Sequence, residues 1–406
     1  MRGKKRGFPK ALLFLGPGML AAMADNDAGG IISYAVTGAK FGCSVFIPLT
    51  LCLVLVTYTV QEMAMRLGIA AGSGYTHLLR VYYGRGWMVF QVTALFTENL
   101  ITLVTEFIGM SAGLSLIGIP NAASVIISAA LIMSIAVFSG YNTKEKFGLI
   151  IGLLNLFFII FAFFTKPNVS INKSIALSSG TDFRWYSAAL IGNAIAPWMI
   201  FYQNSAYADK GVKSQYIKKG RADTIAGCVC QVTIAAALIW IGSSVYGLIP
   251  NIEQAGPLEI VSALSDKCGT SAGVLFALGL FNSGLLASIT VSLSSSWSVA
   301  EAFGWAKSLN DKISEAPGFY GIYFISVCIA AAAVMFSNLP LNFTAVFAQV
   351  AGAVLMAPVL IFLTLITSKK NIMGEYANNK SQKIRAWICV GTLIVVSVFT
   401  FLRIVL

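Results

Sequence analysis

The chain has 406 residues, of which 57% are hydrophobic and only 11% are charged. A soluble protein needs far more charge on its surface, so this composition excludes a soluble fold and predicts one membrane domain covered by lipid. The net charge of +12 does not indicate nucleic-acid binding, because the basic residues lie in short patches between apolar runs.

A helix needs about 20 apolar residues to cross the hydrocarbon of a bilayer. By that measure the chain is an all-α membrane protein with eleven transmembrane helices, of which the first and the sixth are interrupted. The predicted spans are 8–39, 42–66, 88–117, 121–140, 147–165, 185–208, 224–248, 270–303, 317–336, 341–367 and 384–406.

The charge distribution predicts the orientation. With the N-terminus in the cytoplasm, most of the 28 Lys and Arg residues fall on the cytoplasmic side of the eleven spans. We therefore expect a multi-pass protein of the cell membrane with a cytoplasmic N-terminus and an extracellular C-terminus.

Two spans contain helix-breaking sequence. The first carries Gly16-Pro17-Gly18 and then Asp25–Gly30, and the sixth carries Gly192–Pro197. Pro197 lacks a backbone donor and clashes with the preceding turn, so it frees carbonyl groups around residue 193. Such breaks are tolerated at membrane depth only where protein or a water-filled cavity satisfies the freed groups.

The positions of the two breaks predict the organisation of the domain. Spans one and six are corresponding members of two five-helix halves, and interrupted helices at matching positions of inverted repeats mark a transporter's binding site. We expect one transporter domain over 1–406, with a first repeat at about 8–165, a second at about 185–367 and an extra helix at about 384–406.

Asp25 and Asp27 are the most informative side chains. A carboxylate inside a span costs ~2.5–3.5 kcal/mol even on a lenient insertion scale, and the nearest basic residues in the sequence are Lys10 and Lys40. At least one carboxylate, Asp27 in preference to Asp25, is expected to bind a cation together with unwound carbonyls. Alternatively, both face an aqueous vestibule or cap a half-helix.

Catalytic constellations are missing from the sequence. The single histidine, His77, has no acidic partner nearby, Ser294–Ser296 have no base, and no glycine-rich loop carries a phosphate-binding lysine. We therefore expect neither an enzyme nor a cofactor. The predicted partners are a cation as substrate and the lipid bilayer, with no obligate protein partner.

Several motifs resemble those of the natural resistance-associated macrophage protein (Nramp) family. Gly16-Pro17-Gly18 with Asp27-Ala28-Gly29-Gly30 is similar to the GPG…DPGN signature of that family. Further similarities run along the chain, at Arg66–Ile69, Thr105–Gly109, Gly284-Leu285, Ser294–Ser296, Gln349-Val350 and Met373–Glu375. The resemblance implies a leucine-transporter-like fold and a divalent metal substrate.

The resemblance also implies a metal site. Its members would be Asp27, the carbonyl of Ala24, the position of Gly30, the span-six positions Asn193 and Ala196 next to Pro197, and Gln349.

Two of these positions depart from the family pattern for manganese or iron. Gly30 replaces an asparagine and Ala196 replaces a methionine, whose thioether is a soft ligand that favours transition metals. Asn193 stands where the family usually has a small residue. The remaining donors are oxygens in a wider site, which suits Mg²⁺, an ion that keeps several waters. Alternatively, Gly30 and Ala196 are tolerated changes around a manganese site.

The residues of proton coupling also differ. Leu103 stands where proton-coupled relatives have an aspartate, Trp198 and Gln203 replace histidines, and no Lys or Arg lies between Lys312 and Lys369. Proton relays need titratable groups along the path. We expect uncoupled Mg²⁺ uptake, with Glu106 in a structural role as a hydrogen-bonding partner of the span-six backbone.

Three alternatives stay open. The first is a proton-coupled Mn²⁺ or Fe²⁺ transporter on the same fold. The second is a sodium-coupled symporter of a small organic solute, which the Asp27 carboxylate opposes by repelling a substrate carboxylate. The third is a membrane scaffold or receptor, which the lack of a sizeable soluble domain disfavours.

Overall fold

A computed structural model describes residues 15–137, 140–167, 180–252, 257–337 and 341–405, and these are entirely helical apart from turns and loops. Within them, eight helical segments are long and apolar enough to cross a membrane. They are α3 (Phe46–Ala71), α5 (Arg85–Ser115), α7 with α8 (Tyr141–Leu154 and Phe157–Ala162), α12 (Ile217–Ser243), α14 (Thr270–Phe303), α15 (Pro317–Phe336), α16 (Leu341–Thr367) and α18 (Lys380–Val405).

The other three predicted spans are shorter or broken helices. The first span consists of α1 (Pro17–Ala24) and α2 (Ala28–Phe41), and the sixth of α10 (Gly180–Ala194) and α11 (Pro197–Asp209). The fourth is the apolar helix α6 (Asn121–Val137). Both predicted interruptions are therefore present. The count of eleven spans and the inverted repeats stay predictions, and the expected start of the first span at residue 8 lies outside the described residues.

Some boundaries differ from the prediction for a physical reason. Helix α7 begins at Tyr141, six residues before the expected start. The charged Lys144 near its N-terminal end is buried and paired within the protein. Lys144 Nζ donates to the Leu309 carbonyl at 3.1 Å and to the Tyr320 hydroxyl at 2.7 Å. The short helices α4 (Tyr75–Tyr83), α13 (Pro257–Cys268) and α17 (Lys370–Met373), which are too short to span a bilayer, lie between the spans.

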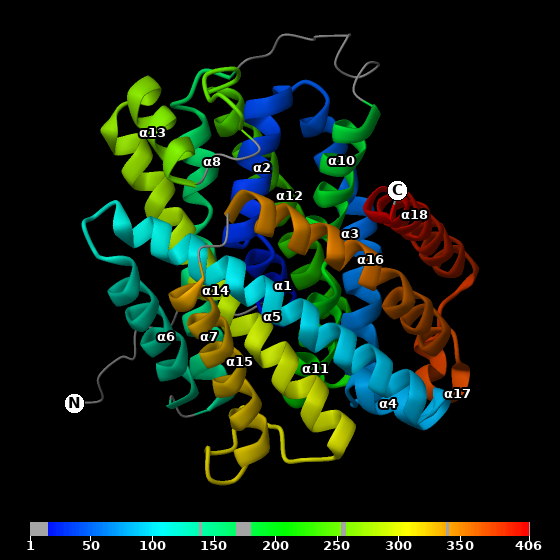
Figure 1. The fold of residues 1–406 in the computed structure, drawn as a ribbon. Coiled ribbons are helices and arrows are strands. Elements are labelled where there is room, and N and C mark those ends of the chain that lie inside the picture. Colours follow the sequence, from blue (N-terminus) through cyan, green and yellow to red (C-terminus); the bar gives the residue numbers. More distant parts are fainter. Residues whose placement is uncertain (1–14, 138–139, 168–179, 253–256, 338–340, 406) are drawn as a thin grey trace, which may run out of the picture.

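The broken helices α1 and α2 lie in the interior of the bundle (Figure 1). All eight residues of α1 are buried, and α1 packs mainly against α12, while α2 packs against α12 and α16. Helices α5 and α14 pack along each other in front of them, and α18 lies at the edge against α16 and α3 (Figure 1). Protein therefore surrounds the break between α1 and α2, as non-helical backbone at membrane depth requires.

Candidate metal-binding site

The first break places Asp27 at the start of α2. Asp27 is the N-cap residue, in an extended backbone conformation, and its Oδ1 accepts the Gly30 N–H at 2.5 Å. An N-cap carboxylate satisfies an otherwise unpaired amide of the first helical turn and interacts favourably with the helix dipole. The local sequence thus positions this carboxylate at the helix end, and both the capping and the cation-binding interpretations of Asp27 are compatible with that position.

Two amide side chains from distant helices meet Asp27 and Gly30. Gln349 of α16 donates from Nε2 to Asp27 Oδ1 at 3.5 Å. Asn193 of α10 lies directly against Gly30, because a Cβ added to Gly30 would be 2.6 Å from Asn193 Oδ1. The structure therefore brings together four of the predicted site residues, from α2, α10 and α16.

The Asn193 amide is buried and poorly paired. Among the described residues, no hydrogen bond of ordinary geometry reaches its Oδ1 or its Nδ2, and the Tyr34 side chain interacts with the amide. A buried, poorly paired amide is costly, and such groups in native proteins call for an explanation such as an ion or a water. Asn193 is therefore the side chain whose chemistry most directly indicates a ligand at this place.

The second break places Ala196 and Pro197. Helix α10 ends at Ala194, Ala196 is the extended N-cap of α11, and Pro197 is the first residue of that helix. Proline suits this position because the first helical N–H has no partner in any case. The Ala194 carbonyl accepts Gln231 Nε2 at 3.0 Å and Thr57 Oγ1 at 3.3 Å. Side chains of α12 and α3 thus already use this freed carbonyl.

Ala24 and Ala196 lie at the ends of helices that border the two breaks. Ala24 is the last residue of α1 and is fully buried, and Ala196 is 4% exposed. The recorded contacts of the site join Asp27, Gly30 and Gln349 with Asn193 and do not extend to these two alanines. Their contribution of backbone oxygens stays a prediction.

Glu106 corrects one expectation. Its Oε2 accepts the Ala28 N–H at 2.8 Å, so α5 supports the start of α2, the second half of the first broken span. The expected partner was the backbone of the sixth span. The reason is geometric: Gly109, one turn further along α5, packs directly on Ala28, which brings the Glu106 side chain to the N-terminal amides of α2.

Asp25 is bound by a side chain of α12. Its Oδ2 accepts a hydrogen bond from Gln231 Nε2, and the Gln231 carbonyl accepts Asn26 Nδ2 at 3.2 Å. Sequence reasoning missed Gln231, although a glutamine in the middle of an apolar span is itself a signal of a buried polar network. Gln231 joins both broken helices, because it also binds the Ala194 carbonyl.

Glu98 is a second residue that sequence reasoning missed. It lies on α5 two turns before Glu106, is 2% exposed, and its Oε2 has no hydrogen-bond partner, while its Oε1 accepts Thr102 Oγ1 at 3.1 Å. The signal was a carboxylate inside the predicted third span. Glu98 adds a titratable group to a region in which the sequence analysis recognised only Glu106 and the aspartates.

Four acidic side chains form a buried cluster. Asp25, Asp27, Glu98 and Glu106 are each at most 3% exposed, and none takes part in an ion pair recorded for the described residues. Buried carboxylates without a cationic partner favour binding of a cation. No group of three His, Cys, Asp or Glu residues suited to a metal is found in the described part of the chain, so amide or carbonyl oxygens and water must complete any metal site.

One end of α1 is closed by Asp223 of α12. The Asp223 carboxylate accepts the N–H groups of Gly16 and Gly18, each at 2.8 Å, and of Met19 at 3.2 Å. It also accepts the Tyr207 hydroxyl at 2.7 Å. These contacts satisfy the first amides of α1 and hold its N-terminal end against α12 and α11.

Comparison with known proteins identifies relatives over nearly the whole chain. Residues 18–403 match the family model described as natural resistance-associated macrophage protein-like. The "Divalent metal cation transporter MntH" of Bacillus subtilis (strain 168) is 29% identical over 428 aligned positions, which cover 98% of this chain and 93% of that protein.

Solved structures show the same fold. The Eremococcus coleocola manganese transporter has a TM-score of 0.76 at 19% identity, covering 98% of this chain and 88% of that one. MHP1, a nucleobase-cation-symport-1 family transporter, has a TM-score of 0.62 at 12% identity, covering 95% of this chain and 91% of that one. At these identities the likeness concerns the fold alone.

Proposed function

This chain belongs to the Nramp family, and from that premise we propose that it takes up Mg²⁺ in partly hydrated form, by alternating access and without proton coupling. The chain is a divalent metal cation transporter and not an enzyme. The proposal adds the identity of the ion and the energy source.

The observation that carries the proposal is the buried, poorly paired Asn193 amide beside Gly30 and Asp27. It offers an oxygen to a cation held by the Asp27 carboxylate, and the Gln349 amide offers another once its oxygen rather than its nitrogen faces the ion. One carboxylate with neutral oxygen donors is the donor set typical of Mg²⁺, which retains several waters.

The small residues support the same conclusion. The side chains of Gly30 and Ala196 supply no ligand atom, so no thioether is present at position 196 to favour a transition metal. Gly30 also leaves room for Asn193, since any larger side chain at position 30 would overlap the Asn193 amide. An asparagine contributed from α10 thus takes the place of the one that the family pattern has in α2.

The membrane potential supplies enough energy for uptake. For a doubly charged ion, ~100 mV contributes about 4.6 kcal/mol, at about 2.3 kcal/mol per elementary charge. Leu103, Trp198 and Gln203 occupy positions where the family pattern of proton-coupled members has titratable residues. Of the two buried carboxylates on α5, Glu98 and Glu106, Glu106 is engaged with the backbone of α2.

Proteoliposomes that contain a Mg²⁺ dye and a pH dye test the proposal. At an inside-negative potential we expect Mg²⁺ influx without acidification, and no influx for the Asp27→Asn variant. Acidification in fixed proportion to the Mg²⁺ flux would refute uncoupled transport.

The second candidate is a proton-coupled manganese transporter. The buried Glu98 carboxylate, whose Oε2 has no hydrogen-bond partner among the described residues, favours it. Micromolar Mn²⁺ that suppresses the flux of millimolar Mg²⁺ in the same vesicles would establish this candidate instead.

A further inference from the structure

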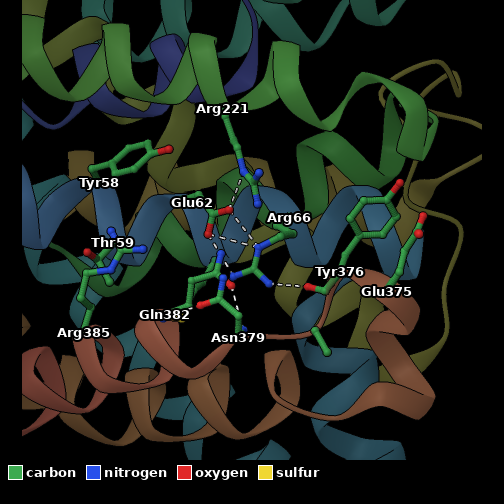
Figure 2. Close-up of a pocket in the computed structure, with 12 residues that line it drawn as sticks. Tyr58, Thr59, Glu62, Arg66, Arg221, Glu375, Tyr376, Asn379, Gln382 and Arg385 are labelled. Carbon is green, nitrogen blue, oxygen red and sulfur yellow. Dashed lines mark hydrogen bonds and ion pairs between the residues drawn. The ribbon is translucent and has the colours of Figure 1, made fainter.

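A polar cavity of about 450 Å³ lies where α3, α12 and α18 meet, away from the metal site (Figure 2). The segment from α17 to the start of α18, which includes the 3-10 turn η3 (Gly374–Tyr376), closes one side. The lining residues are Tyr58, Thr59, Glu62, Met63, Arg66, Arg221, Glu375, Tyr376, Ala377, Asn379, Gln382 and Arg385. We refer to this space as the arginine cavity.

Arg66 is the structural centre of the arginine cavity. It is 1% exposed, and its guanidinium donates to Glu62 Oε1 at 2.9 Å, to the Tyr376 carbonyl at 2.5 Å and to Asn378 Oδ1 at 2.6 Å. Every guanidinium nitrogen of Arg66 therefore has a partner within the protein. Arg66 holds α3 and the segment before α18 together, and its donors are not available to a ligand.

Arg221 and Arg385 retain unused donors. Arg221 binds Glu62 Oε1 only through Nε, at 2.9 Å, so its two terminal nitrogens have no partner among the described residues. In the same part of the chain, no hydrogen bond or ion pair is recorded for Arg385. The lining holds three arginines, Arg66, Arg221 and Arg385, and two carboxylates, Glu62 and Glu375, so the cavity is net positive by one charge. The opposing carboxylate, Glu375, lies at the other end of the view from Arg385 (Figure 2).

Exposed apolar side chains follow the arginine cavity one helical turn away on each of the three helices. One turn deeper into each span lies a large exposed hydrophobic side chain: Leu55 on α3 (72% exposed), Ile225 on α12 (40%) and Ile388 on α18 (62%). Residues three or four positions apart share a helix face. The polar lining residues Tyr58, Arg221 and Arg385 therefore sit above these apolar ones, and the surface changes from cationic to apolar within one helical turn.

We propose that the arginine cavity binds the phosphate-bearing headgroup of an anionic phospholipid, with an acyl chain along Leu55, Ile225 and Ile388. Arginine matches phosphate through paired N–H donors, and basic pockets between membrane helices on the cytoplasmic side suit anionic headgroups. A free phosphate would use the arginines equally well but would leave the apolar continuation without a role.

The arginine cavity includes a residue of α12 close in sequence to Asp223, which binds the N-terminal end of α1. Arg221 lies two residues before Asp223, the carboxylate that binds the first amides of α1. A headgroup held by Arg221 and Arg385 links α12 to α18 near that contact. Occupancy is therefore expected to stabilise this arrangement of α1 and α12.

The test is a titration of phosphatidylglycerol into the purified full-length protein in a neutral detergent, followed by the midpoint of thermal unfolding. Phosphatidylglycerol should raise the midpoint and phosphatidylcholine should not. The apparent affinity should fall about fivefold in Arg385→Gln, since one basic residue near an anionic surface contributes about 1 kcal/mol. The matched control is Lys383→Gln on the same helix, which removes an exposed charge outside the cavity lining and should leave the affinity unchanged.

Three results would overturn the proposal. Equal loss of affinity in Lys383→Gln and Arg385→Gln would show general attraction to basic residues. Unchanged affinity in Arg385→Gln would place the lipid elsewhere. Equal stabilisation by inorganic phosphate or glycerol phosphate, without acyl chains, would identify a soluble phosphate as the occupant. Because Arg385 has no recorded partner in the described protein, its substitution is not expected to impair folding.

Discussion

Gly30 and Asn193 lie in direct contact across the gap between the two broken helices, so close that a Cβ on Gly30 would be 2.6 Å from Asn193 Oδ1 and 2.9 Å from Asp27 Oδ1. The Asn193 amide fits at its place only because Gly30 has no side chain. This relationship links the two departures from the family pattern at positions 30 and 193 into one change.

Gly30→Ala is therefore expected to lower Mg²⁺ transport strongly, because the new methyl group displaces the Asn193 amide or the Asp27 carboxylate. Adding Asn193→Ala should restore the space but not the ligand, so binding should stay weak while the thermal midpoint recovers. Mg²⁺ calorimetry and thermal unfolding measure the two effects. Gly321→Ala on α15 is the control, since a Cβ at that position meets nothing within 4 Å; an equal loss of Mg²⁺ binding in that variant would contradict the argument.

Asp27→Asn separates the charge of Asp27 from its capping role. Asparagine caps a helix about as well as aspartate, so the N-cap bond to Gly30 should persist and the thermal midpoint should change little. Asp27 is the carboxylate that contacts both Gly30 and Gln349, so its loss should reduce Mg²⁺ and Mn²⁺ affinity by more than tenfold in calorimetry. Asp27→Ala should lose both affinity and stability. Retained metal affinity in Asp27→Asn would exclude Asp27 as a ligand.

Glu106 is expected to act through the backbone of α2. Glu106→Gln keeps an oxygen that accepts the Ala28 N–H and should retain most transport. Glu106→Ala leaves that amide unpaired and should cost roughly 1–3 kcal/mol of stability. Thermal unfolding and Mg²⁺ flux distinguish these outcomes. A Glu106→Gln variant that is stable yet inactive would instead indicate that the protonation of Glu106 is part of transport.

Asp223 is expected to keep the N-terminal end of α1 closed. In Asp223→Ala the amides of Gly16, Gly18 and Met19 lose their acceptor, so hydrogen exchange in peptides covering 15–24 should accelerate. Asp209→Ala is the control, because the Asp209 carboxylate accepts the Leu309 N–H at 2.8 Å and does not contact α1. Unchanged exchange in Asp223→Ala would mean that packing alone holds α1.

The sequence by itself determined the features that depend on local chemistry. Apolar length indicated the spans, and Pro197 and the run from Asp25 to Gly30 located the two breaks, because proline and glycine disturb a helix wherever it packs. The motif resemblance also selected Asp27, Gly30, Asn193 and Gln349, which the structure brings together.

Only the tertiary structure decided which groups pair. Glu106 binds α2 rather than the sixth span, Asp25 binds Gln231, and the arginine cavity forms between α3, α12 and α18. Each of these contacts joins helices far apart in the chain, and the rotation of one helix against another decides which side chains meet. That rotation is set by packing over the whole bundle, so no local pattern of residues predicts it.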